Sequence, residues 1–286
     1  MNENDYWWEI ELSADNDEEL LSIIDISGSI GSSFKSERNA IAYYVSSKPL
    51  EYWTGVIESL LPAFNSVKIM GSGKIGYRSW HKEWKEAFPP LDVGDKFVVL
   101  APWHRGTETI SRIPLFIYPA TAFGTGYHES TQIALSLLEK NVDRIQGKKV
   151  ADIGTGSGVL AIAAIKLGAE FAFARDIDPA VFQEVRGNMN ENGLAYESLE
   201  LHTGDLLNDF HAKVDVITAN ILFGPLCSML PDVVRVLNKK GIAVFSGLLA
   251  RERSDFILNA NEAGLTLNDE LTINEWWGAS FSIVQN

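Results

Sequence analysis

An apolar segment runs into a glycine-rich turn at residues 152–158, DIGTGSG, and a helix-forming segment follows at once. Gly154, Gly156 and Gly158 allow the backbone to turn tightly and to bring main-chain N–H groups against a ligand. The N-terminus of the following helix adds a partial positive charge. Ligands of open α/β sheets bind at the carboxyl ends of the strands. The turn therefore predicts a ligand site on an α/β sheet.

The surrounding sequence alternates between apolar strands and amphipathic helices from about residue 131. Because this alternation is typical of βα units, it predicts a mostly parallel sheet with helices on both faces. We expect the first helix to be capped by Ser130 or Thr131. The predicted strands cover residues 148–154, 170–178, 214–221 and 241–249, and the predicted helices cover residues 130–141, 158–168, 179–193 and 225–237.

The first 76 residues form a different pattern, with the order β-α-β-β-α-β. This order predicts a small ferredoxin-like α+β domain. A helical pattern follows and stops at Pro89-Pro90, as helices do near proline. We expect a linker helix over residues 77–92. The catalytic domain would then occupy residues 93–286, with further strands at 96–101 and 113–118.

The glycine spacing separates two classes of cofactor. Dinucleotide enzymes use G-x-G-x-x-G, and here Val159 stands at the third-glycine position, which weakens the nicotinamide reading. Asp176, at the end of the next predicted strand, is the residue expected to bind ribose hydroxyls. Strand alternation points Arg175 to the opposite face from Asp176. The spacing and the acid favour a nucleoside-type cofactor.

Asn220 lies near the end of the predicted strand 214–221, at the ligand end of the sheet, in the sequence ANILFGPL. This segment resembles the Asn-Pro-Pro-aromatic motif of methyltransferases that act on amines and amides. A side-chain oxygen there can accept an N–H bond and aim an amine lone pair. We expect Asn220 to be the catalytic residue, acting by orientation in a direct displacement.

Several motifs together carry a family resemblance: AFGTGYHEST, DIGTGSGVLAIAAIKLGA, DIDPAV, ANILFGPL, SGLL and NEWW occur in this order. The chain resembles the ribosomal protein L-eleven (L11) methyltransferase family (PrmA). The resemblance implies a seven-stranded Rossmann-like methyltransferase domain with S-adenosylmethionine as cofactor. It implies a basic large-subunit ribosomal protein as substrate, methylated on lysine side chains and the N-terminal α-amine, and recognised by the N-terminal domain. The cofactor-binding residues that it implies are Thr131, Gly154, Gly156, Asp176 and Asn220.

The first glycine-rich run, residues 120–131, is interpreted as a lid segment over the same cofactor. Gly124 and Gly126 would allow close approach, and Thr131 would supply a polar contact. Two positions in this run depart from the family, which usually has His-Pro-Thr-Thr. Glu129 would add a negative charge near a cationic cofactor, whereas Ser130 retains a hydroxyl.

Four further residues have a functional and a structural interpretation. Arg175 replaces a usually apolar residue of the family and would pair with Asp176. His128 is interpreted as a loop histidine that bonds the backbone. Trp276 and Trp277 are interpreted as packing residues at a strand end.

Composition limits the partners. The formal net charge is −14, so we expect a basic protein partner and no direct binding of nucleic acid. Cys227 is the only cysteine, and the histidines show no metal-ligand spacing. The acidic N-terminal segment does not resemble a signal peptide. We expect a cytoplasmic monomer with no metal and no membrane contact.

Three alternatives remain open from the residues. A methyltransferase of this fold could act on a different protein lysine or on a small-molecule amine. A nicotinamide oxidoreductase would need the glycine loop to hold a pyrophosphate. A non-catalytic binding module would keep the fold without the chemistry, and the presence of both Asp176 and Asn220 argues against it.

Overall fold

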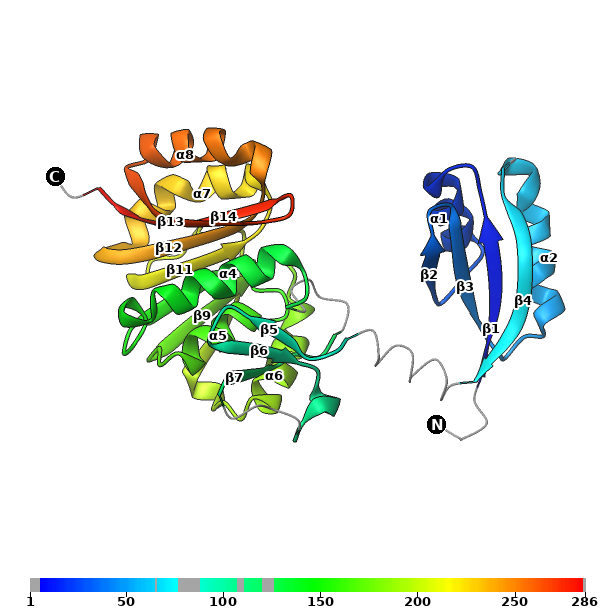
Figure 1. Cartoon of the computed structure of the whole chain (residues 1–286), viewed down its shortest axis with the longest axis horizontal. Helices are drawn as coiled ribbons and strands as arrows, with labels where there is room; N and C mark the ends of the chain where they lie inside the picture. Colours follow the sequence, from blue (N-terminus) through cyan, green and yellow to red (C-terminus); the bar gives the residue numbers. More distant parts are fainter. Residues whose placement is uncertain (1–5, 65, 77–87, 107–110, 120–125, 285–286) are drawn as a thin grey trace. The chain divides into compact units, whose positions relative to one another are not determined.

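The structure is a computed structural model that describes residues 6–64, 66–76, 88–106, 111–119 and 126–284. The chain divides into two compact units, Met1–Ala87 and Phe88–Asn286 (Figure 1). The buried hydrophobic clusters of the first unit include no residue of the second, and the reverse also holds. Each unit therefore has its own core.

The smaller unit contains a four-stranded antiparallel sheet in the order β2-β3-β1-β4. Two helices connect its strands, so the elements follow the β-α-β-β-α-β order along the chain. They are β1 (Tyr6–Ser13), α1 (Asp17–Ile26), β2 (Gly31–Ser36), β3 (Asn39–Val45), α2 (Leu50–Leu60) and β4 (Lys68–Gly76).

The core of this unit lies between one face of the sheet and the two helices. Alternate residues of β1, Ile10 and Leu12, and of β3, Ala40, Ala42 and Tyr44, are fully buried there. Strand alternation directs these side chains to one face. Apolar residues of α1 and α2 cover that face.

The larger unit is built on a seven-stranded sheet in the order β10-β9-β8-β11-β12-β14-β13. The first five strands are parallel, and β14 is antiparallel to both of its neighbours. The predicted mostly parallel sheet is confirmed. The strands are β8 (Lys149–Ile153), β9 (Phe171–Asp176), β10 (Leu199–Thr203), β11 (Val214–Asn220), β12 (Leu237–Leu249), β13 (Leu265–Ile273) and β14 (Trp276–Ile283).

Helices cover both faces of this sheet (Figure 1). On one face α4 (Glu129–Lys140), α5 (Val159–Lys166) and α6 (Val181–Glu191) share a core, and on the other α7 (Phe223–Val236) and α8 (Arg253–Glu262) share a second core. Within the described ranges, no helix has the length and apolar character that crossing a membrane requires.

A small three-stranded sheet packs on the core formed by α4, α5 and α6. Its strands are β5 (Leu91–Val93), β6 (Phe97–Leu100) and β7 (Ile113–Phe116), so the strands predicted at 96–101 and 113–118 are confirmed. The predicted linker helix 77–92 is wrong at its end, where β5 begins. Pro89 and Pro90 favour an extended chain there. Residues 77–87 lie outside the described ranges.

The direction of chain progress through the large sheet reverses between β8 and β11. The chain runs outward from β8 through β9 to β10, and outward again from β11 to β12. Ligands of open α/β sheets bind at such a switch point, beyond the carboxyl ends of the strands.

Candidate functional site

A cavity of about 530 Å³ lies at the carboxyl ends of the central parallel strands. Residues at or just after the carboxyl ends of β8, β9, β10 and β11 contribute to its wall, together with Gly247 of β12. This is the expected position at the switch point. The lining residues are Gly154, Gly156, Asp176, Ile177, Val181, Gly204, Asp205, Leu206, Asn220, Ile221, Leu222, Pro225 and Gly247. Four of the five predicted site residues, Gly154, Gly156, Asp176 and Asn220, therefore meet at one cavity.

The glycine loop between β8 and α5 requires glycine at its first position. Gly154 has φ +69°, in the left-handed region that other residues rarely adopt. A Cβ there would lie 2.5 Å from Cγ2 of Ile221. The strand end and the segment after β11 can approach each other only because this side chain is absent.

The amides of the glycine loop are largely used within the chain. Gly154 and Thr155 donate to the carbonyl oxygen of Arg175, at 2.8 and 3.0 Å, and Gly158 donates to Thr155 at 2.8 Å. The Gly156 amide donates to Oδ2 of Asp176 at 3.0 Å. The expectation that these amides face the ligand is therefore wrong. A pyrophosphate would need such donors, so the loop disfavours a dinucleotide.

Asp176 ends strand β9 and lines the cavity. Its Oδ2 accepts from Gly156, and its Oδ1 accepts from the amide of Asp178 at 3.0 Å. These bonds fix the carboxylate, and each carboxylate oxygen can accept a second hydrogen bond. Asp176 is thus held in place with acceptor capacity left for the hydroxyl groups of a ligand.

Arg175 does not pair with Asp176, contrary to the prediction. Its side chain is 7% exposed, and its guanidinium donates to the carbonyl oxygen of Asn208. It also lies against Gly204, where a Cβ would clash with it. Strand alternation separates the two side chains, so Arg175 supports the segment after β10 and leaves Asp176 free.

A second carboxyl group, Asp152, is buried beneath the loop. It is 1% exposed and accepts hydrogen bonds from the hydroxyl groups of Thr155 and Thr218, both at 2.7 Å. Burial raises the pKa of Asp152 to about 6, although the two threonine hydroxyls oppose the shift. The two bonds tie the loop to strands β8 and β11.

Asn220 ends strand β11 and is 8% exposed. Its Nδ2 donates to Oγ1 of Thr131 at 3.1 Å, whereas its Oδ1 has no hydrogen-bond partner in the described residues. Gly247 leaves space beside that oxygen, because a Cβ at this position would lie 2.9 Å from it. Since a buried acceptor without a partner is costly, Asn220 presents an oxygen that a ligand N–H would satisfy.

Thr131 reaches the site through Asn220. It is fully buried on α4 and does not belong to the cavity wall. Its hydroxyl fixes the orientation of the Asn220 amide, and this contact joins residues 89 positions apart in the sequence. The structure thus links the end of the first glycine-rich segment to the end of strand β11 by a side-chain bond.

The start of helix α4 differs from the prediction. His128, and not Ser130 or Thr131, is the N-cap, and its Nδ1 accepts from the amide of Ser130 at 3.2 Å. The interpretation of His128 as a backbone-bonding residue is confirmed. Glu129 is not among the residues that line the cavity, and its Oε1 accepts from Nδ2 of Asn274 at 3.1 Å.

The lid segment and the two late tryptophans are the remaining sequence predictions near the start of α4. Half of the lid segment, residues 120–125, lies outside the described ranges. Gly126 approaches strand β6, because a Cβ there would lie 2.7 Å from Cγ1 of Val99. Trp277 is fully buried and Trp276 meets His128 edge-on at 4.6 Å between ring centroids, as packing residues.

Sequence reasoning missed the wall segment Gly204–Leu206 and Gly247. The first follows β10, a strand that was not predicted, so its acid Asp205 was not recognised as a strand-end residue. The signal was an acidic residue after an apolar pair in LELHTGDL. Gly247 lies in the SGLL motif, to which no role was assigned.

The charges of the cavity favour a cationic ligand. Asp176 and Asp205 are the charged residues of its wall, and the described wall contains no Lys or Arg. Opposite charges attract across such a low-dielectric site. No group of three or more His, Cys, Asp or Glu side chains in the described part of the chain is arranged to hold a metal ion. The site fits a nucleoside that carries a positive charge.

Comparison with known proteins identifies relatives. The family model of ribosomal protein L11 methyltransferase (PrmA) matches residues 7–282. A protein named ribosomal protein L11 methyltransferase from Clostridium botulinum (strain Eklund 17B / Type B) is 34% identical over 209 residues, 73% of this chain. One from Chromohalobacter salexigens is 37% identical over 199 residues, 70% of this chain. Both alignments span 65% of the relative's own length.

A solved structure agrees with these matches. The ribosomal protein L11 methylase from Lactobacillus delbrueckii subsp. bulgaricus superposes with a TM-score of 0.62 at 28% identity, and the match covers 69% of this chain and 100% of that one. The family model covers nearly the whole chain. The chain therefore belongs to the ribosomal protein L11 methyltransferase (PrmA) family.

Proposed function

We propose that this protein transfers methyl groups from S-adenosylmethionine to amines of ribosomal protein L11, both lysine side chains and the N-terminal α-amine. The observation that carries the proposal is the buried, unpartnered Oδ1 of Asn220 at the wall of a cavity whose charged residues are both acidic. An amine acceptor offers the N–H that this oxygen lacks, and a sulfonium offers the positive charge that the carboxylates attract.

S-adenosylmethionine fits the residues present. Asp176 would accept from the ribose hydroxyls, and Gly154 and Gly156 leave room for the cofactor along the loop. Thr131 would act through Asn220, whose amide it holds. When bound, the cofactor supplies an electrophilic methyl group that an amine lone pair takes up by direct displacement, while the C–S electron pair stays with sulfur.

The chain's own residues prepare the acceptor amine. Asn220 would accept an N–H bond at Oδ1 and thereby aim the nitrogen lone pair. A lysine amine has a pKa near 10.4 in water and must lose a proton before it reacts. The apolar wall lowers the pKa of an entering amine by desolvation. Ile177 and Leu222 extend this wall to the surface, where they are 70% and 69% exposed.

The N-terminal unit is proposed to be a ferredoxin-like recognition domain, residues 1–76, joined by a linker at 77–92 to the methyltransferase domain at 93–286. Its strand order supports this description. The chain's net charge of −14 suits a basic ribosomal protein and disfavours nucleic acid. An acceptor of this class implies a cytoplasmic reaction, and we propose that the enzyme acts as a monomer.

Labelled S-adenosylmethionine tests the proposal in a lysate that lacks its own L11 methyltransferase. The expected result is one labelled protein, identified as L11. Label on other proteins or on small molecules would favour the alternative acceptors. Absence of label, together with absence of cofactor binding by calorimetry, would contradict any methyltransferase function.

A further inference from the structure

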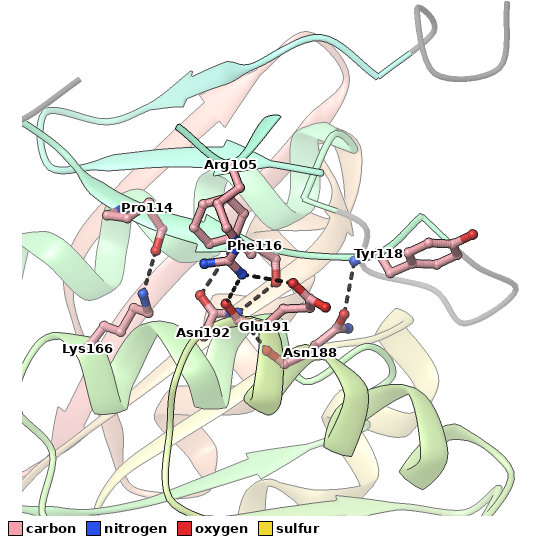
Figure 2. Close-up of polar contacts among 8 residues, drawn as sticks. All are labelled: Arg105, Pro114, Phe116, Tyr118, Lys166, Asn188, Glu191 and Asn192. Atoms are coloured by element: carbon pink, nitrogen blue, oxygen red, sulfur yellow. Dashed lines mark hydrogen bonds and ion pairs between the residues drawn. The ribbon is translucent and has the colours of Figure 1, made fainter. Parts of the chain in front are cut away.

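Strand β7 lies at the edge of the three-stranded sheet, and helix side chains bond its outer edge (Figure 2). Its inner edge pairs with β6, and the amides of Ile113 and Ile117 donate to that side. Alternate residues present their backbone groups to the other side. Those groups belong to Pro114, Phe116 and Tyr118, and α5 and α6 satisfy them.

Lys166 and Asn192 are two of the side chains that bond the outer edge of β7. Within the described residues they hydrogen-bond the strand and, for Asn192, its own helix region, but not the glycine loop. Nζ of Lys166 donates to the carbonyl oxygen of Pro114 at 2.7 Å. Asn192 bonds Phe116 twice, accepting from its amide at 3.0 Å and donating to its carbonyl oxygen at 2.7 Å. Arg105 completes the cluster by donating to Glu191 while its guanidinium stacks 4.5 Å from the ring of Phe116.

Asn188, one turn earlier on α6, differs from Asn192 in what it joins. Its Oδ1 accepts from the amide of Tyr118 at 2.9 Å, and its Nδ2 donates to the carbonyl oxygen of Ser157 at 2.9 Å. The side chain is 1% exposed. One buried amide thus connects the end of β7 to the glycine loop.

The position of Ser157 makes this contact relevant to the cavity. Ser157 lies between Gly156, which lines the cavity, and Gly158, which begins α5. Gly158 also fits closely against α6, since a Cβ there would lie 2.9 Å from Cγ1 of Val185. Helix α6 therefore fixes this part of the loop by packing and by the hydrogen bond from Asn188.

We propose that Asn188 is a positioning residue for the cofactor-binding loop. Its bond to Ser157 holds the loop so that Gly156 keeps its position in the cavity wall. Its bond to the amide of Tyr118 connects the loop to the chain segment just after β7. The inference rests on the proposed function, because it assigns the loop to S-adenosylmethionine. Asn188 itself does not touch the reacting atoms.

The matched test compares Asn188→Ala with Asn192→Ala in the full chain. Asn188 lies in α6 and Asn192 is the C-cap of that helix, and both bond the outer edge of β7 or its extension. Only Asn188 also contacts the loop. Binding of S-adenosylmethionine is measured by calorimetry well below the melting temperature of each variant. We expect about a tenfold weaker affinity for Asn188→Ala, since a buried carbonyl loses its donor. Asn192→Ala should stay within about twofold.

Kinetics and a second variant separate positioning from general destabilisation. With Asn188→Ala the KM for the cofactor should rise about tenfold, while kcat at saturating cofactor stays within about twofold. Asn188→Asp keeps an acceptor for Tyr118 and loses the donor to Ser157, so it should lose at least as much affinity. If Asn188→Ala does not fold, Asn188→Asp replaces it in the comparison with Asn192→Ala.

Two results would overturn the inference: equal loss of affinity in the Asn188 and Asn192 variants, or wild-type affinity in Asn188→Asp. A wild-type protein that binds no S-adenosylmethionine would contradict the proposed function first, and the inference with it.

Discussion

Asp176 and Asn220 occupy the same cavity with different surroundings, and this difference separates their roles. Asp176 is held by two backbone amides and keeps acceptor capacity for ribose hydroxyls. Asn220 is oriented by Thr131 and presents an oxygen without a partner. At the scale of single residues, one side chain is suited to holding the cofactor and the other to aiming the acceptor.

Single substitutions test this division. Asp176→Ala should weaken S-adenosylmethionine binding about tenfold or more, because a charged acceptor is lost. Asn220→Ala should mainly lower kcat, by about a hundredfold, because the amine is no longer aligned. Calorimetry gives the affinities, and turnover at saturating cofactor gives kcat.

Asp178→Ala is the control for the first substitution. Asp178 is an exposed acid two residues further on that caps the amide of Ala180. Its loss should change cofactor affinity by no more than about twofold. Equal losses of affinity in the Asp176 and Asn220 variants would show that the two residues share one role.

The raised pKa of Asp152 predicts a pH-dependent stability. Its folded pKa of about 6 exceeds the ordinary aspartate pKa of 3.8. Its contribution is therefore fully present below pH 3.8 and is lost as the pH rises through 6. Asp152→Asn removes the titration, so its stability relative to wild type should rise between pH 4 and pH 7 by up to about 3 kcal/mol.

Denaturant unfolding of both proteins across this range checks the prediction. The difference in unfolding free energy should be smallest near pH 4 and level off above pH 7. A difference that is constant with pH would show that Asp152 does not titrate in this range.

The sequence located the site residues at strand ends but not their partners. Asp176 and Asn220 could be predicted because a strand's end and its alternation are local properties. The partner of Asn220 is Thr131 and the partner of Arg175 is the carbonyl of Asn208, and both contacts depend on tertiary packing. For the same reason, the sequence did not predict that the loop amides donate to the carbonyl oxygen of Arg175 and to the carboxylate of Asp176.

At the scale of elements, helix α4 contacts both the end of strand β11 and the small three-stranded sheet. Its N-terminal residue Thr131 meets Asn220, and its buried Glu139 accepts from the amides of Asp95 and Lys96, at 2.8 and 2.9 Å. Those amides belong to the turn between β5 and β6. One helix thus anchors both Asn220 and the small sheet.

Glu139→Gln should lower the unfolding free energy by about 1–2 kcal/mol. An amide can replace only one of the two acceptor oxygens, and bonds to a charged acceptor are stronger. Urea denaturation measures the change. Glu262→Gln, at an exposed position of α8, is the matched control and should stay within about 0.5 kcal/mol. Equal effects at both positions would contradict the anchoring role.

The βα units were predictable because each carries a clear apolar pattern, and their alternation predicted the parallel sheet. The strands that were missed include β5 and β10. β5 has only three residues, and the only apolar residues of β10 are Leu199 and Leu201. Their positions depend on pairing with β6 and β9, which the sequence does not encode locally.

At the scale of the molecule, the two units have separate cores, and this separation predicts that they act separately. A protein of residues 88–286 contains every member of the three hydrophobic clusters of the larger unit. It should fold, and its affinity for S-adenosylmethionine should lie within about threefold of that of the full chain, since domains with their own hydrophobic cores can fold alone.

Methylation of intact L11 should respond differently to this truncation. If the first unit recognises the substrate, kcat/KM for L11 should fall about tenfold or more without it, mainly through KM. Steady-state assays with varied L11 concentration provide the comparison. An unchanged kcat/KM would remove the recognition role from the N-terminal unit.

The most direct measurement of the central claim is the intact mass of purified ribosomal protein L11 after incubation with S-adenosylmethionine and this enzyme. We predict mass increases of one or more methyl groups, mapped to lysine side chains and the N-terminal amine, and a strongly slowed increase with Asn220→Ala. An unchanged mass in the presence of an enzyme shown to bind the cofactor would contradict the account.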